Sequence, residues 1–126
     1  MTGREAENYV AEYLSKQDFF VGDFNKSNSG QQPFDQIAIN NNKVLAYDVK
    51  HCKRDYFPFT RVEDNQIRAL SYLDSLNNPV IETYIMLVYK EKITTLPFKE
   101  FLSLKGKDDK SVKPSSLKPL KEVLQC

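Results

Sequence analysis

The stretch FDQIAINNNKVLAYDVK, residues 34–50, decides the fold of this chain. Two apolar runs, 34–39 and 43–51, flank three consecutive asparagines. β-branched and aromatic residues favour strands, and asparagine favours the tight turn between them. The pattern therefore predicts a β-hairpin at the centre of a sheet.

The register of this hairpin would bring two carboxylates together. If the loop is symmetric about Asn41 and Asn42, residues that face each other have numbers that sum to 83, as Asp35 and Asp48 do. Opposed Cβ atoms lie roughly 4.5–5.5 Å apart. Lys50 follows Asp48 by two residues, so its side chain leaves the same face of the strand.

Two carboxylates at that separation repel each other, and burial increases the repulsion. A divalent cation between them would compensate, and oxygen ligands suit Mg²⁺, with Mn²⁺ as a possible substitute. A lysine beside such a cation could orient a water molecule or stabilise the charge of a phosphate. These groups are the equipment for metal-assisted hydrolysis of a phosphodiester.

A different interpretation of the same residues is an exposed ladder of aspartate and lysine across two strands. An acid followed two residues later by lysine is a weak signal, because chance predicts about two such triplets in a chain of this composition. Two are present, at 48–50 and 108–110. The second lies in a polar stretch, where we expect it to be solvated, and spacing alone does not separate the two interpretations of the first.

The remaining pattern predicts helices and strands on both sides of the hairpin. Apolar residues recur at helical spacing over 5–16, where Thr2 and Glu5 can form a capping box. The other expected elements, in chain order, are a strand at 19–24, a polar loop at 25–33, a loop at 52–62, a helix at 63–77, strands at 80–90 and 92–96, a short helix at 98–102, a polar flexible stretch at 105–114, and a last helix marked by Leu117, Leu120 and Leu124. This order predicts one α/β domain over residues 1–126, with helices around a single sheet.

Two of the helices place polar residues near their apolar stripes. Glu7 falls at the edge of the stripe of the first helix. Gln66 shares a stripe with Ala69, Leu70 and Leu73, so its amide points toward the core and needs partners there. The side chain of Gln66 either forms its hydrogen bonds at the start of its own helix or makes a polar contact near Asp35 and Asp48.

Composition limits the class of protein. A chain of 126 residues with 40% apolar residues and fifteen aromatic side chains can fill one core. No apolar run approaches the roughly 18–20 residues of a membrane helix, and the first residues carry acids where a signal peptide needs basic and then apolar residues. We expect a cytoplasmic protein with no membrane partner. Cys52 and Cys126 alone form neither a disulfide framework nor a zinc motif.

Charge is unevenly distributed along the chain. Residues 1–89 carry nine basic and twelve acidic side chains, a net charge of −3, and residues 90–126 carry nine lysines and five acids, a net charge of +4. A protein that only coats nucleic acid usually has a larger basic excess. The total of +1 neither requires nor excludes a nucleic-acid partner.

The ordered series of motifs resembles a known nuclease family. Asp35 followed by Asp48-Val49-Lys50 resembles the PD-(D/E)xK nuclease motif. The segment HCKRDYFPFTRVEDNQIRAL, 51–70, resembles RecU-type Holliday junction resolvases, as do TYIMLVYK, LPFKEFL and KSVKPSSL nearer the C-terminus. Gly3 and Glu7 are similar to the N-terminal helix of these enzymes and of archaeal resolvases.

The resemblance implies a restriction-endonuclease-like fold, a mixed β-sheet flanked by helices. It implies a homodimer that makes paired, Mg²⁺-dependent nicks in four-way DNA junctions, an activity of DNA recombination and repair. Carried over by position, the site would comprise acidic metal ligands at Glu7, Asp35 and Asp48, a carbonyl ligand at Val49, the catalytic lysine at Lys50 and a supporting polar residue at Gln66.

Some positions depart from the family pattern. The second acid is Asp48 where RecU-type enzymes usually carry glutamate, and Asn65 stands where histidine is common. The loop 25–33 is too short for the protruding stalk of RecU-type enzymes, which indicates a compact, phage-like form. The open alternatives are a related nuclease that cuts duplex or flap DNA, and a non-catalytic DNA- or protein-binding module of the same fold.

Other side chains are candidates for binding the DNA backbone. They are Arg4, beside the first helix, and Lys53, Arg54 and Arg61, in the segment after the catalytic lysine. His51 alternates away from the Asp48 and Lys50 face, so we expect a structural or surface role for it. The aromatic residues Tyr56, Phe57 and Phe59 favour core packing over base stacking.

Overall fold

The computed structural model describes residues 1–24 and 33–125. The expected loop at 25–33 therefore lies, except for its last residue, outside the described residues, as does Cys126. The helices are α1 (Gly3–Lys16), α2 (Asp64–Ser75), α3 (Phe98–Gly106) and α4 (Leu120–Val123), with short 3₁₀ turns at η1 (Phe59–Arg61) and η2 (Pro114–Ser116). The strands are β1 (Phe20–Asp23), β2 (Gln36–Ile39), β3 (Val44–His51), β4 (Phe57–Pro58), β5 (Ile81–Tyr89), β6 (Lys92–Pro97), β7 (Ser111–Val112) and β8 (Lys118–Pro119).

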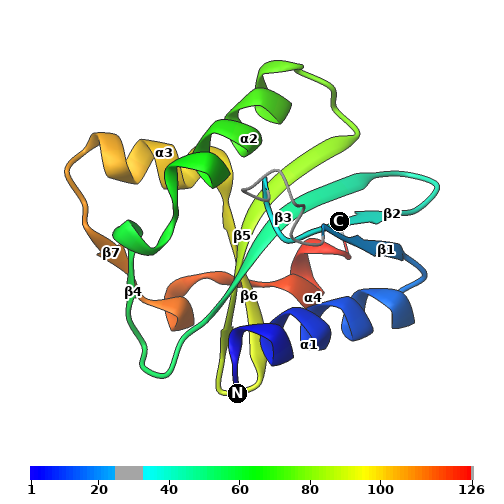
Figure 1. Ribbon diagram of the computed structural model, residues 1–126, viewed down its shortest axis with the longest axis horizontal. Helices are drawn as coiled ribbons and strands as arrows, with labels where there is room; N and C mark the ends of the chain where they lie inside the picture. Colours follow the sequence, from blue (N-terminus) through cyan, green and yellow to red (C-terminus); the bar gives the residue numbers. More distant parts are fainter. Residues whose placement is uncertain (25–32, 126) are drawn as a thin grey trace.

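Six of these strands form one mixed sheet in the order β1-β2-β3-β5-β6-β8. Strands β3 and β5 are parallel, and the other neighbours in this sheet are antiparallel. A parallel neighbour requires a crossover connection, which here includes α2. Figure 1 shows α1 and α4 below the sheet and α2 and α3 above it. The mixed α/β sheet flanked by helices, which the sequence predicts, is confirmed.

The predicted hairpin forms between β2 and β3. Gln36 pairs with Tyr47 and Ile39 pairs with Val44, so the numbers of paired residues sum to 83, as predicted. The side chain of Asn40 closes the turn by accepting hydrogen bonds from two backbone N–H groups that follow it. This register fixes which residues of β3 share a face with the start of β2.

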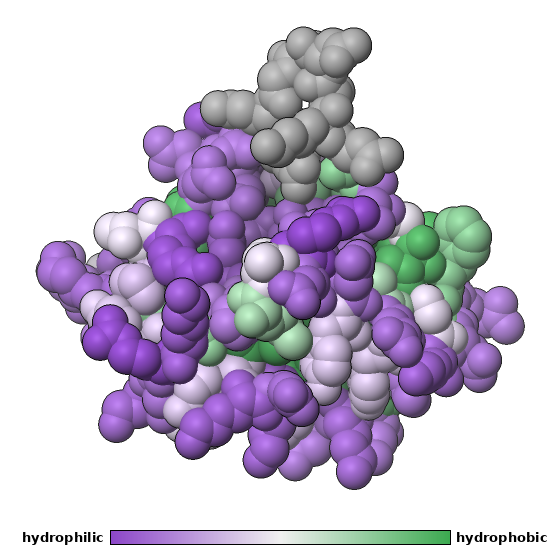
Figure 2. All heavy atoms as spheres, turned by 60° about the horizontal axis from the view of Figure 1, so that its bottom comes forward, coloured by the Kyte–Doolittle hydropathy of each residue, from purple (hydrophilic) through white to green (hydrophobic). Residues whose placement is uncertain are grey.

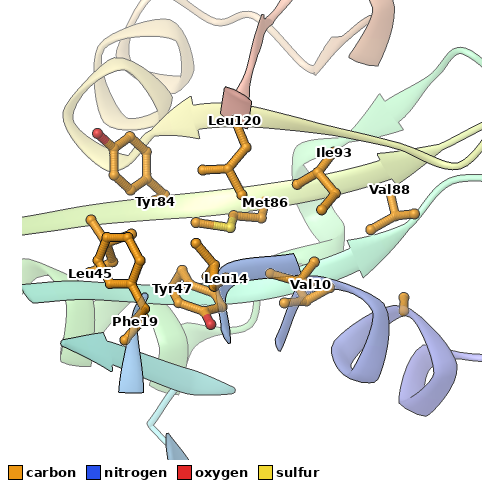
Figure 3. Packing of buried hydrophobic residues seen from close by; sticks show 13 residues of the cluster. Val10, Leu14, Phe19, Leu45, Tyr47, Tyr84, Met86, Val88, Ile93 and Leu120 are labelled. Carbon is orange, nitrogen blue, oxygen red and sulfur yellow. The ribbon is translucent and has the colours of Figure 1, made fainter. Parts of the chain in front are cut away.

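Each face of the sheet packs against its own group of apolar residues. One cluster joins α1 and α4 to the sheet through residues that include Val10, Leu14, Tyr47, Met86 and Leu120, as Figure 3 shows. The capping box between Thr2 and Glu5 that the sequence predicts is present at the start of α1. The second cluster lies under α2 and α3 and contains the aromatic side chains Phe57, Phe59, Phe98 and Phe101.

The structure corrects several predicted elements in the second half of the chain. Residues 52–62, expected to be a loop, contain η1 and the short strand β4, which pairs with β7 from the stretch expected to be polar and flexible. Helix α3 continues to Gly106 rather than stopping at Leu102, and Leu117 precedes the last helix. Two-residue strands have no periodic pattern, so only their distant partner identifies them.

The surface of the described residues is largely polar. Hydrophilic residues cover most of the face turned to the viewer in Figure 2, and apolar residues appear there in separate patches. None of the helices described here has both the length and the apolar composition required to cross a bilayer.

Candidate active site

A groove of about 1310 Å³ opens at the carboxyl end of β3. Its walls come from the first turns of α1, the end of β3, the segment that leads to β4 and the start of α2. The predicted site residues that line it are Arg4, Glu7, Asp35, Val49, Lys50, Lys53, Arg54, Arg61 and Gln66. The fold thus gathers nine of the ten predicted site residues around one groove, and the tenth, Asp48, is fully buried in β3, directly before Val49 and Lys50.

Asp48 is completely inaccessible to solvent, yet it carries an ionisable carboxyl group. Its Oδ1 accepts a hydrogen bond of 2.9 Å from Nε2 of Gln66. The ammonium of Lys50 lies 3.0 Å from Oδ2, which is an ion-pair distance. Besides this ion pair, Oδ2 has no assigned hydrogen bond among the described residues. The predicted placement of Lys50 beside Asp48 is confirmed.

Asp35 lies just before β2 and is 7% exposed. Its Oδ2 accepts a hydrogen bond of 2.7 Å from the backbone N–H of Val49, and its own N–H donates to the carbonyl of Tyr47. Asp35 therefore lies one residue before the first pair of the hairpin, where it contacts β3 in the register that the sequence predicts. From this position its charge acts directly on Asp48.

The environment of Asp48, including the nearby carboxylate of Asp35, makes the ionised form of Asp48 less favourable. Burial is the main cause that raises the pKa of Asp48 above its usual value of 3.8, and the negative charge of Asp35 raises it further. Lys50 offsets only part of this effect. Two neighbouring carboxylates whose charge one lysine balances only in part fit a small divalent cation, which would favour the ionised form.

Glu7 stands beside this pair without joining it. Burial and the charge of Asp35 raise the pKa of Glu7, and Arg4, whose guanidinium lies 3.4 Å from the Glu7 carboxylate, opposes this shift. In residues 1–24 and 33–125, no three side chains of the Asp, Glu, His and Cys types lie close enough to hold one metal ion. Glu7 is therefore adjacent to the pair Asp35 and Asp48, and its role as a metal ligand, which the family resemblance implies, stays a prediction.

A polar contact inside the core fixes the position of Glu7 on α1. Gln36, which is fully buried, donates from Nε2 to the carbonyl of Glu7 at 2.9 Å. Its Oε1 accepts a hydrogen bond of 2.7 Å from the hydroxyl of Tyr47. Burial raises the pKa of Tyr47, so this hydroxyl remains a donor. The first two turns of α1 are thereby tied to the strands that carry Asp35 and Asp48.

Gln66 combines the two roles that the sequence left open. Its Oε1 accepts a hydrogen bond of 2.9 Å from the N–H of Glu63, which completes a capping box at the start of α2. Its Nε2 donates to the carboxylate of Asp48 in β3. The same buried amide therefore starts a helix and positions a carboxylate of the site.

The four residues predicted to bind phosphate all line the groove, but their side chains are held in place to different extents. Arg61 donates to the carbonyl of His51 at 2.9 Å and lies over the ring of Phe57, so its guanidinium is held in place. Arg4 approaches the carboxylate of Asp23 at 3.7 Å as well as that of Glu7. The side chains of Lys53 and Arg54 are exposed to solvent.

The groove also contains residues that were not predicted site residues, among them His51 and Tyr56. His51 lines the wall and is half-buried, although its side chain alternates with that of Lys50 along the strand. Tyr56 also lines the groove and is 49% exposed, whereas its neighbours Phe57 and Phe59 are buried as predicted. The expectation that Tyr56 packs in the core is therefore wrong. Alternation along 54–58 is the only signal that could have separated it from the phenylalanines.

No family model matches this chain, and no curated protein matches it significantly. Among solved structures, the chain is similar to Hjc, a Holliday junction resolvase from the archaeal hyperthermophile Archaeoglobus fulgidus, with a TM-score of 0.59. The sequences are 19% identical, and the match covers 77% of this chain and 73% of the resolvase chain. At this level of identity the similarity shows the fold. The chain therefore has the restriction-endonuclease-like fold that its sequence motifs imply.

Proposed function

We propose that this protein is a metal-dependent DNA endonuclease that makes paired nicks in four-way junctions. The observation that carries the proposal is the buried carboxylate of Asp48, which is paired with Lys50 and acted on by the charge of Asp35, beside a groove that Lys50, Asp35 and several cationic side chains line. Such a carboxylate is costly unless it serves a charged ligand. The fold shared with a known resolvase supports the same conclusion.

The ligands that this chain offers to a cation are all oxygen atoms. The carboxylates of Asp35 and Asp48 and the carbonyl of Val49 would hold Mg²⁺, or Mn²⁺ in its place, and Glu7 would act on the surrounding water shell. Mg²⁺ is commonly held by only one or two carboxylates, with water completing its shell. When bound, the ion would supply a water molecule of lowered pKa and would stabilise charge on the phosphate.

The other residues of the site would hold and orient the reacting groups. Gln66 fixes the rotamer of Asp48 through its hydrogen bond to Oδ1. Lys50, whose side chain is 15% exposed and lines the groove, would shift toward the scissile phosphate and stabilise its developing charge. Water would attack phosphorus in line with the leaving 3′ oxygen.

The cationic wall of the groove would bind the DNA backbone. Lys53 and Arg54 are exposed and would contact phosphates as mobile charges, as would Arg4, which is also paired with Glu7 and Asp23, while Arg61 would do so from a position held by its hydrogen bond to His51. Contacts of this kind position the duplex without reading its sequence. A homodimer with two-fold symmetry would present two such grooves, which matches the two symmetric cuts that a four-way junction requires.

Cleavage of a labelled synthetic four-way junction tests this proposal. The comparison substrates are a matched duplex and a flap, each with Mg²⁺ and with EDTA. The wild-type protein should make paired nicks in the junction only with metal. Asp48→Asn should lower the rate about 100-fold or more and retain DNA binding, because it removes a ligand and not a phosphate contact. Asp109→Asn, at an exposed acid, should match the wild type.

The other outcomes are distinct. Preferential cutting of duplex or flap would identify a related nuclease with a different substrate. DNA binding without metal-dependent cleavage of any substrate would identify a non-catalytic module of the same fold. Full activity of the Asp48→Asn variant would refute the assignment of the site.

A further inference from the structure

We infer that Tyr56 is a specificity-determining residue, whose ring stacks on an unpaired or unstacked DNA base held in the groove. The inference rests on the proposed function and adds what the groove recognises: DNA with an interrupted base stack rather than continuous duplex. Tyr56 is 49% exposed and lines the groove together with Lys50. Among the described residues, its ring has no aromatic or cationic partner and its hydroxyl no hydrogen bond.

The backbone of this segment presents its side chains alternately to two sides. Arg54, Tyr56 and Pro58 line the groove. Phe57, between the last two, is fully buried in the core under α2 and α3. From Tyr56 through β4 this alternation is that of an extended chain, in which successive side chains point to opposite sides. The ring of Tyr56 is therefore directed into the groove by the burial of the residue that follows it.

The residue that precedes Tyr56 is also fixed. The carboxylate of Asp55 accepts hydrogen bonds from the backbone N–H of Ser115, at 2.8 Å, and from its hydroxyl. The backbone N–H of Tyr56 donates to the carbonyl of Arg54 at 2.7 Å, which closes a tight turn. An aromatic ring held between two anchored neighbours loses little conformational freedom on binding, which favours stacking.

The charges around the ring indicate the chemical class of its partner. Lys53 and Arg54 are exposed on the same wall, and Arg61 is held nearby. Asp55, the acid of this segment, does not line the groove, since it is paired with Ser115. An exposed ring between cationic side chains matches a nucleotide, whose base stacks while its phosphate is bound by the cations. In continuous duplex every base is already stacked between its neighbours, so only a branch point, a flap or a frayed end would engage Tyr56.

Binding measured without metal tests this inference separately from cleavage. The probe is a four-way junction with 2-aminopurine at the branch point, and the reference is a duplex of the same sequence, both in EDTA. Tyr56→Ala should weaken junction binding about 5- to 150-fold, which is the range for loss of one base–aromatic stack, and leave duplex binding unchanged. The 2-aminopurine fluorescence should be quenched on binding of the wild type and not of this variant.

Two control variants make the result specific to the ring. Tyr56→Phe keeps the ring and should match the wild type. Tyr72→Ala removes a tyrosine that is 66% exposed on α2 and does not line the groove, so it should also match the wild type. Equal loss on junction and duplex with Tyr56→Ala, or no loss on either, would overturn the inference. If the wild type prefers the junction through Tyr56 but cuts no DNA with Mg²⁺, the inference stands and the proposed catalysis fails.

Discussion

The residue with the most unusual environment in the candidate site is Asp48, a carboxylic acid that is fully buried. Its carboxyl group is removed from water, receives one hydrogen bond and one ion pair, and faces a second carboxylate. Three opposing effects therefore act on one proton: burial and Asp35 favour the neutral acid, while Lys50 favours the anion. Burial is the largest of them. The metal-free pair should hold a proton at pH values where an exposed aspartate is ionised.

This proton makes stability depend on pH. The pKa of Asp48 is raised in the folded state, from 3.8 to about 8, so the folded protein binds a proton that the unfolded chain has lost. Stability in EDTA should therefore fall as pH rises from about 4 to about 8. Urea midpoints across this range should fall more steeply for the wild type than for Asp48→Asn, which has no proton to lose. Parallel curves would show that the pair does not titrate in this window.

Gln66 should affect both the site and the helix that carries it. Gln66→Met keeps the buried volume but leaves Oδ1 of Asp48 and the N–H of Glu63 without their partners. We expect unfolding free energy to drop by about 1–3 kcal/mol. We also expect 10- to 100-fold weaker Mg²⁺ binding, because Gln66 orients the carboxylate of Asp48, which we propose as a metal ligand.

The Gln66 effect needs two readouts, a urea denaturation curve and a Mg²⁺ titration of the folded variant. Arg68→Met, at an exposed position of the same helix, is the control and should leave both unchanged. A loss of stability with normal Mg²⁺ affinity would assign Gln66 to the helix cap alone.

At the scale of elements, the segment between β3 and α2 is organised by distant parts of the chain. Strand β4 pairs with β7, and Asp55 binds Ser115 at the start of η2. This wall of the groove therefore depends on the C-terminal segment, although all its lining residues lie in the first 66 residues. The hydrogen bonds from Ser115 lower the pKa of Asp55.

Breaking this contact should loosen the C-terminal segment. Asp55→Ala removes the acceptor of the Ser115 amide, so the exchange of that amide with D₂O should become faster when it is followed by NMR. Branched-DNA binding should weaken at the same time, because the anchor next to Tyr56 is lost. Asp109→Ala, at an exposed acid of the α3–β7 connection, should change neither measurement. Unchanged exchange of Ser115 would mean that pairing of β4 with β7 suffices to hold the segment.

For the whole molecule, the sheet acts as a frame that joins two helices at one site. Helix α1 reaches it through Gln36 and Tyr47, and α2 reaches it through the hydrogen bond between Gln66 and Asp48. A ligand that binds both carboxylates therefore bridges β2 and β3 and acts indirectly on α2. Binding at such a point should stabilise the entire domain rather than one loop.

Divalent cations should therefore raise the melting temperature of the protein. A ligand present at 100 times its dissociation constant stabilises the folded state by about 2.7 kcal/mol. Thermal denaturation with increasing Mg²⁺ or Mn²⁺ should show this rise in the wild type and little in Asp48→Asn. Ca²⁺ and a matched ionic strength of NaCl serve as controls for a general salt effect. Equal stabilisation of both proteins would place the cation elsewhere.

The sequence by itself determined the features that depend on spacing within one element or one hairpin. The symmetric turn set the register of the hairpin, in which the numbers of paired residues sum to 83. Alternation along β3 placed Lys50 beside Asp48, and the spacing of Thr2 and Glu5 set the start of α1. These contacts follow from the repeat of a strand or a helix, which the order of residues specifies directly.

Only the tertiary structure decided which distant residues meet. The contact of Gln66 with Asp48 depends on how α2 crosses the sheet, and that of Asp55 with Ser115 spans 60 residues. The structure also turned Tyr56 toward the groove, because Phe57 fills the core beside it. No local repeat encodes the distance and angle between packed elements. These follow from the close packing of all the core side chains at once.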